Sequence, residues 1–305
     1  MSWLVFAFSG PVLWAISTHL DKYLVDKYFK DSNVAVLLIF TALIGLFALP
    51  FIWSFEPSVT ALGLRGAAVM GFSGLLYMGA MLLYLRALQA EEASVVAPFY
   101  QAAPLFGYIL GYAVLGERLS DLQMLGGGLI VCGAGLASLQ FGNQKRFNGR
   151  LAGLMLVCAL ALAVSSLIFK IFAVRGDFWP TTFWMYAGEA AFGAALLLVP
   201  AYRNQFTQLL RQSPGAVLSV NAANELINLG GGLGTRYALI LAPLSLVQAI
   251  GSTTTVFVFL FGVLLSVFYP VLEHEDLSRS ELIRKGCSAV LVALGTVLAS
   301  GFGVD

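Results

Sequence analysis

The chain has 305 residues, of which 59% are hydrophobic and only 11% are charged, and its 17 Lys and Arg nearly balance its 16 Asp and Glu. A soluble protein of this length would carry roughly 25% charged residues, so this composition excludes a surface that faces mainly water. The near-neutral balance and the lack of a basic block also argue against nucleic acid as a partner.

Ten apolar stretches follow one another along the chain, each close to the roughly 20 residues that a helix needs to cross a bilayer. They cover residues 3–24, 34–55, 63–89, 93–115, 121–140, 149–173, 179–200, 214–240, 243–271 and 281–301. Their continuous hydrophobicity favours helices, because strands of a membrane barrel would alternate apolar and polar residues over about ten positions. We therefore predict an all-α integral membrane protein with ten transmembrane helices joined by short loops.

The second half of the sequence matches the first half at a nearly constant offset. The aligned pairs include Ser17 with Ser165, Lys22 with Lys170, Gly45 with Gly193, and Glu117 with Glu275. These matches divide the chain into two five-helix repeats, residues 1–142 and 143–305. Because five is an odd number, the second repeat must enter the membrane from the opposite side. Inverted repeats of this kind are typical of secondary transporters that bind their solute near the midplane and work by alternating access.

Nearly the whole chain resembles a known family. The residues that carry the resemblance are Ala87-Leu88 through Ala93-Ser94-Val95-Val96-Ala97-Pro98, then Pro104 and Gly116-Glu117-Arg118-Leu119, with Trp14-Ala15 and Lys22 in the first helix. The pattern is similar to the ten-helix EamA-type family of the drug/metabolite transporter superfamily. This resemblance implies two EamA-like repeats and a central cavity lined by the first, third, fourth, sixth, eighth and ninth helices. It also implies cytoplasmic termini, whereas the distribution of Lys and Arg favours the reverse orientation.

Ionisable side chains at membrane depth cost roughly 2.5 to 3.5 kcal/mol each, so they tend to face a cavity and mark function. Glu225 is the clearest candidate for a substrate or proton site, because Asn221 and Asn228 share its helix face and Asn224 is adjacent. The alternative is a structural carboxylate bonded to neighbouring helices. The other predicted substrate-binding residues suit a polar organic solute: Trp14, Ser17, Thr18, Tyr77, Tyr84, Tyr100, Gln101, Ser165, Ser166, Gln248 and Ser252. For each Ser or Thr, the alternative is a bond to its own helix backbone.

Four residues are predicted to act in coupling or gating: His19, Lys22, Lys170 and Glu225. His19 could carry a proton near neutral pH, and its alternative role is packing. The two lysines lie near helix ends, where long side chains reach the interface, and we expect the same of Arg236. For Glu189 the sequence leaves function and packing equally open.

The sequence contains no HExxH, GxSxG or P-loop motif, and Cys132, Cys158 and Cys287 lack metal or disulfide spacing. We therefore expect no enzyme activity, no metal and no cofactor. The predicted function is export of a small polar or amphipathic organic metabolite, amino-acid-like or drug-like, across the cytoplasmic membrane. A proton or a counter-solute is the candidate coupling partner. The alternative is a lipid-linked-sugar flippase or another non-exporting membrane protein on the same fold. The sequence leaves the solute, the direction of transport and the oligomeric state open.

Overall fold

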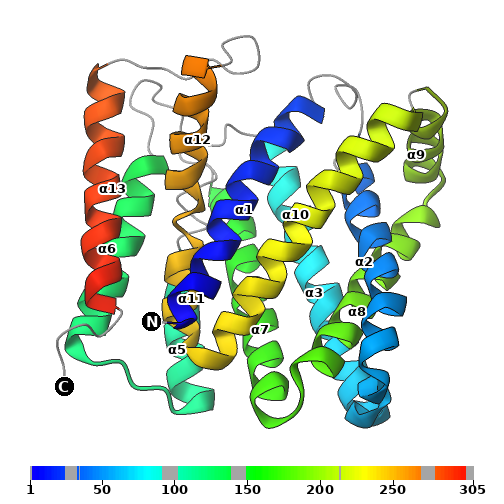
Figure 1. The fold of residues 1–305 in the computed structure, drawn as a ribbon, viewed down its shortest axis with the longest axis horizontal. Helices are drawn as coiled ribbons and strands as arrows, with labels where there is room; N and C mark the ends of the chain where they lie inside the picture. The colour runs from blue at the N-terminus through cyan, green and yellow to red at the C-terminus, as the bar shows by residue number, and fades with distance from the viewer. Residues whose placement is uncertain are drawn as a thin grey trace.

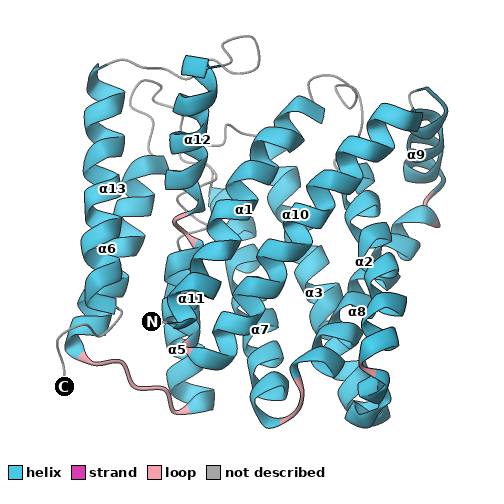
Figure 2. Ribbon diagram, in the orientation of Figure 1, coloured by secondary structure: helices cyan, strands magenta, loops and turns pink. Residues whose placement is uncertain are grey.

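The computed structural model describes residues 2–24, 33, 35–90, 102–138, 149–212, 214–268 and 279–299, and within these ranges every regular element is helical (Figure 1 and Figure 2). In chain order the elements are α1 (Ser2–Leu24), α2 (Ala35–Phe55), the 3-10 helix η2 (Pro57–Leu62), α3 (Gly63–Ala90), α5 (Ala102–Leu110), the π-helical turn η3 (Gly111–Leu115), α6 (Asp121–Ser138), α7 (Gly149–Arg175), α8 (Phe178–Leu197), α9 (Pro200–Gln212), α10 (Pro214–Leu241), α11 (Leu244–Gly251), α12 (Thr254–Phe268) and α13 (Arg279–Ala299). Each predicted range contains a helix, so the all-α prediction is confirmed.

Several of these helices are apolar enough to cross a membrane. Among the described residues, 5 segments pass by length and composition: Trp3–Leu20, Ala35–Phe55, Pro57–Ala87, Gly153–Arg175 and Leu244–Leu265. The number rises to 6 if α8 and α9, which meet at an angle of 97°, are taken as one span. The chain therefore has the helices of a multi-pass membrane protein, while a full set of ten crossings and their inverted arrangement stay predictions.

The hydrophobic pattern does not predict the helix α9, because residues 201–213 lie between two predicted spans. Its apolar side chains Tyr202, Phe206, Leu209 and Leu210 recur at three- and four-residue intervals and pack against the cluster that includes α2. The rings of Phe206 and Phe40 have centroids 4.9 Å apart. This spacing makes α9 an amphipathic helix, which lies beside α2 and α10 at the edge of the bundle opposite α6 and α13 (Figure 1).

The range 243–271 reads as one continuous apolar helix, but the structure divides it into α11 and α12. At the break, three consecutive hydroxyls bond to the preceding turn: Ser252 donates to the carbonyl of Ala249 at 2.6 Å, Thr253 to Ile250 at 2.6 Å, and Thr254 to Gly251 at 2.8 Å. Hydroxyls that compete for backbone carbonyls weaken a helix, which accounts for the interruption.

Small residues set the closest helix crossings, as the abundance of glycine in the sequence suggests. A Cβ atom at Gly188 of α8 would overlap the carbonyl oxygen of Gly71 in α3, and one at Gly74 would overlap the carbonyl of Met185. Without a hydrophobic drive between helices in lipid, such close backbone approach supplies the packing energy. The crossings of α1 with α10 and of α6 with α13 use glycine in the same way.

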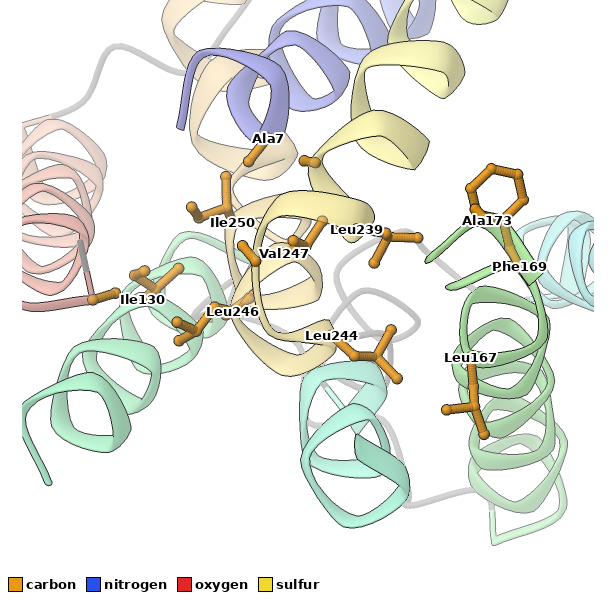
Figure 3. Packing of buried hydrophobic residues seen from close by; sticks show 14 of the residues in the cluster. Ala7, Ile130, Leu167, Phe169, Ala173, Leu239, Leu244, Leu246, Val247 and Ile250 are labelled. Carbon is orange, nitrogen blue, oxygen red and sulfur yellow. The ribbon is translucent and has the colours of Figure 1, made fainter. Parts of the chain in front are cut away.

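The largest hydrophobic core surrounds α11 (Figure 3). Its side chains Leu246, Val247 and Ile250 pack among residues from α1, α6, α7 and α10, including Ala7, Ile130, Leu167, Phe169 and Leu239. The helices α1 and α6 come from the first predicted repeat, whereas α7, α10 and α11 come from the second. Both halves of the sequence therefore contribute to one core.

Candidate functional site

A polar stripe runs along one face of α10. It consists of Asn221, Glu225, Asn228, Gly232 and Arg236, which follow one another at intervals of three or four residues. Residues at these intervals lie above one another on a helix. Because Asn221, Glu225 and Arg236 are buried, this face of α10 points into the protein.

Glu225 lies near one end of this α10 stripe, one turn after Asn221, and is 6% exposed. The hydroxyl of Thr41 in α2 donates to its Oε1 at 2.8 Å, and Nδ2 of Asn228 donates to its Oε2 at 3.4 Å. Glu225 and Asn228 therefore lie on the same face of α10, as the helical spacing predicted. Thr41 was missed, because the sequence does not show which residue of another helix lies opposite Glu225.

A buried ion pair forms the other end of the α10 stripe. Nη2 of Arg236 donates to Oε1 of Glu189 in α8 at 2.5 Å, and the two residues are 8% and 4% exposed. The guanidinium also lies over the ring of Tyr186, 4.4 Å from its centroid, which is a cation–π contact. The expectation that Arg236 extends to the interface is therefore wrong. Glu189 supplies a counter-charge inside the protein, so the guanidinium stays buried.

Tyr77 of α3 lies within electrostatic range of charged groups at both ends of the α10 stripe. It interacts electrostatically with Glu189, Arg236 and Tyr186 at one end and with Glu225 at the other. The candidate site thus gathers polar groups from α2, α3, α8 and α10. It has acidic groups at both ends, a guanidinium at one end and a phenol between them, an arrangement that suits a polar organic molecule.

Lys170 of α7 joins three segments at a separate position. Its ammonium group forms an ion pair with Glu117 and donates to the carbonyl of Ala242 at 2.5 Å. The carboxylate of Glu117 in turn accepts the backbone N–H of Leu244 at 2.9 Å. This arrangement ties the turn after η3 to α7 and to the connection between α10 and α11. Gly116, with φ of 68°, reverses the chain at the end of η3 and so positions Glu117.

Several predicted site residues bond to backbone or to a neighbouring helix. Nε2 of His19 lies 3.0 Å from the carbonyl of Val258 in α12. The hydroxyl of Thr18 donates to the carbonyl of Trp14 in its own helix at 2.8 Å. The hydroxyl of Ser252 donates to the carbonyl of Ala249, three residues earlier. Ser165 and Ser73 exchange hydrogen bonds between α7 and α3, with their hydroxyl oxygens 3.0 Å apart. The contacts of Thr18 and Ser252 are the own-helix bonds named as the alternative for Ser and Thr, that of His19 is a packing contact, and Ser165 instead bonds to a neighbouring helix.

The remaining predicted residues lie in different surroundings. The Trp14 ring packs against Gly231, Tyr84 packs in a cluster with Cys158, and the side-chain oxygen of Gln248 fills the space beside Gly107. Ser17 and Asn224 are buried and Ser166 is partly buried. Tyr100 and Gln101 lie outside the described residues, as does the side chain of Lys22. The residues gathered around the α10 stripe are thus only part of the predicted set.

A search of the described residues for three or more His, Cys, Asp or Glu that could hold a metal ion finds none. In the same part of the chain, Cys158 is buried, whereas Cys132 and Cys287 are exposed.

Comparison with known proteins identifies the first half of the chain. Residues 1–139 match the EamA-like transporter family. This part of the chain is an EamA-like domain. A solved crystal structure also aligns with 99% of this chain and 99% of its own length, with a TM-score of 0.71 and 16% identity, which shows a shared fold. No curated protein matches the chain significantly. The resemblance to the EamA-type family is therefore confirmed for residues 1–139, and membership in this transporter family indicates a membrane transporter.

The EamA-like domain contributes directly to the candidate site. It contains α2 and α3, which supply Thr41 and Tyr77. The facing residues Glu189, Glu225 and Arg236 come from α8 and α10, beyond residue 139. The candidate site thus lies between the EamA-like domain and the second half of the chain.

Proposed function

We propose that the protein is a secondary transporter that exports a small polar or amphipathic organic metabolite, amino-acid-like or drug-like, across the cytoplasmic membrane. The match of residues 1–139 to the EamA-like transporter family carries this proposal. The buried polar groups around the α10 stripe support it, because ionisable side chains at membrane depth tend to line solute pathways. Export is driven by a proton or counter-solute gradient.

The proposed mechanism is alternating access by two inverted five-helix repeats, residues 1–142 and 143–305. The helix pairing supports this arrangement, because α1 packs on α10 while α7 packs on α3. In the order of the repeats α1 corresponds to α7 and α3 to α10, so the two pairings are equivalent. The solute binds between the repeats, where the α10 stripe faces Thr41 and Tyr77, and rocking of the repeats exposes it to each side in turn.

Glu225 is the proposed residue at which solute or proton binding is coupled to transport. We expect Glu225→Gln to abolish transport, or to uncouple it from its gradient, because the amide keeps the size and loses the charge. The protein should stay folded, since an amide oxygen still accepts the hydrogen bond from Thr41. Asp177→Asn is the matched control, because Asp177 is exposed at the start of α8.

The test uses purified protein in liposomes and a panel of amino acids, sugars and cationic drugs. Movement of at least one solute by the unmodified protein and by Asp177→Asn, but not by Glu225→Gln, would support the proposal. Unchanged transport and pH dependence in Glu225→Gln would remove Glu225 from the site. If no solute moves, or if only a lipid-linked sugar crosses the bilayer, the exporter proposal fails.

A further inference from the structure

Two buried polar atoms beside the Glu189–Arg236 ion pair make no hydrogen bond of ordinary geometry among the described residues, although their two side chains lie close enough to attract each other. They are Nη1 of Arg236 and the hydroxyl oxygen of Tyr186, and their residues are 8% and 4% exposed. An unmet buried hydrogen bond costs about 1 to 3 kcal/mol, and more for a charged group, so such pairs of atoms are rare in folded proteins. Eight buried side-chain atoms of the described residues make no hydrogen bond of ordinary geometry, and these two differ from the rest in lying on neighbouring side chains of the candidate site, so that one ligand can complete both.

Gly232 leaves space next to the hydroxyl of Tyr186. It lies one helical turn before Arg236 on the α10 stripe, and a Cβ atom built on it would meet only the hydroxyl of Tyr186, at 3.9 Å. The neighbouring glycines differ, because a Cβ at Gly231 would come within 3.0 Å of Trp14 and one at Gly234 would overlap Ser9. Gly231 and Gly234 are thus required for the contact with α1, whereas Gly232 leaves room on the side that faces Tyr186.

The hydrogen-bond donors of Arg236 and Tyr186 indicate which class of ligand can bind here. Glu189 accepts from Nη2 of Arg236, so Nη1 still presents donors in the fixed plane of the guanidinium, and the phenol of Tyr186 adds another donor. Donors arranged in this way match the two oxygens of a carboxylate. Resting on the proposed transport function, we propose that Arg236 and Tyr186 bind a carboxylate group of the transported solute in the space beside Gly232.

The charges around Arg236 and Glu189 restrict the class of solute further. Arg236 and Glu189 already cancel, the phenols of Tyr77 and Tyr186 add no charge, and Glu225 farther along the α10 stripe is acidic, so an added carboxylate leaves an uncompensated negative charge in the site. An uncompensated charge is costly in a buried site. The solute therefore brings its own ammonium group, as an amino acid does, or binds together with one proton.

The test measures binding to the purified full-length protein by thermal shift with pairs of compounds that differ only at the carboxylate. The pairs are the L-amino acids with their primary amides and benzoate with benzamide. We expect at least one acid to bind at least tenfold more tightly than its amide. A preference for an amino acid identifies the zwitterion, and a preference for benzoate identifies a carboxylate that binds with a proton.

Two variants test whether the preference for an acid over its amide arises at Arg236 and Tyr186. Gly232→Leu fills the space, and the double variant Glu189→Gln/Arg236→Gln removes the guanidinium without leaving an unpaired charge. In both variants, the affinity for the acid relative to that for its amide should fall about tenfold. Gly128→Leu is the matched control, since Gly128 is an exposed glycine of α6 and a Cβ atom on it would have no neighbour within 4 Å.

Amides that bind as tightly as their acids would overturn the carboxylate site, as would a preference that survives in both variants. This failure is distinct from failure of the proposed function. Transport of solutes without a carboxylate preference removes only the site, whereas the absence of any transported solute in liposomes removes the transporter proposal itself.

Discussion

Arg236 and Glu189 depend on each other because neither has another opposite charge in hydrogen-bond contact among the described residues. Removing one partner of a buried ion pair leaves the other charge uncompensated, while removing both leaves a neutral site. The pair therefore stabilises the fold through mutual neutralisation rather than through a net gain over uncharged residues. A comparison of single and double substitutions separates these two contributions.

We expect Glu189→Gln to lower the free energy of unfolding by about 3 to 5 kcal/mol, because the Arg236 guanidinium remains buried without its counter-charge. The double variant Glu189→Gln/Arg236→Gln should recover most of this loss. Thermal and denaturant unfolding of the purified protein would measure both. A double variant that is as unstable as the single one would contradict this account of the pair.

At the scale of the element, glycine decides how closely α3 and α8 approach. A side chain at Gly188 has no room, because its Cβ would overlap the carbonyl of Gly71 and backbone atoms cannot rotate away. A side chain added to a glycine on an open helix face would not overlap a neighbouring helix. The two helices thus depend on glycine for their contact and not for flexibility.

We predict that Gly188→Val separates α3 from α8 and lowers the free energy of unfolding by at least about 1 to 3 kcal/mol, the usual cost of overpacking. Gly128→Val controls for the change in helix propensity from glycine to valine, since Gly128 faces open space on α6. Melting temperatures of the two variants in the same detergent would test this. Equal melting temperatures would show that the close crossing is not required.

At the scale of the whole molecule, contacts between the two halves of the chain hold the bundle together. Ser73 of α3 and Ser165 of α7 exchange hydrogen bonds, and Lys170 of α7 binds Glu117 from the other half. The core around α11 likewise includes residues from both halves. If the halves rock during transport, a covalent bond between them should stop it.

The Ser73 and Ser165 hydroxyl oxygens, 3.0 Å apart, give a place for such a bond. In a background in which Cys132, Cys158 and Cys287 are replaced by alanine, we expect Ser73→Cys/Ser165→Cys to transport solute when reduced. Oxidation should reduce transport at least tenfold, and a reducing agent should restore it. Either single cysteine variant is the control. Full transport by the oxidised, crosslinked protein would rule out rocking about this contact.

Much of the fold could be predicted from the sequence, because the hydrophobic run that a membrane span needs lies within a single stretch of the chain. Each span must be long and apolar enough for lipid, and each predicted range contains a helix. The shared face of Glu225 and Asn228 also follows from helix geometry alone. The sequence was less informative at 252–254, where three hydroxyls interrupt a helix that hydrophobicity predicted as continuous.

The sequence by itself determined that the chain lies in lipid, that it is helical and where most of its helices lie, and it indicated the EamA-type family. These features depend on composition and on residues close together in the chain. Only the tertiary structure decided that Arg236 pairs with Glu189, that Thr41 binds Glu225, and that Lys170 binds Glu117. These partners lie on different helices, and which side chains meet depends on the rotation and depth of each helix. Those quantities are fixed by packing, which no single segment encodes.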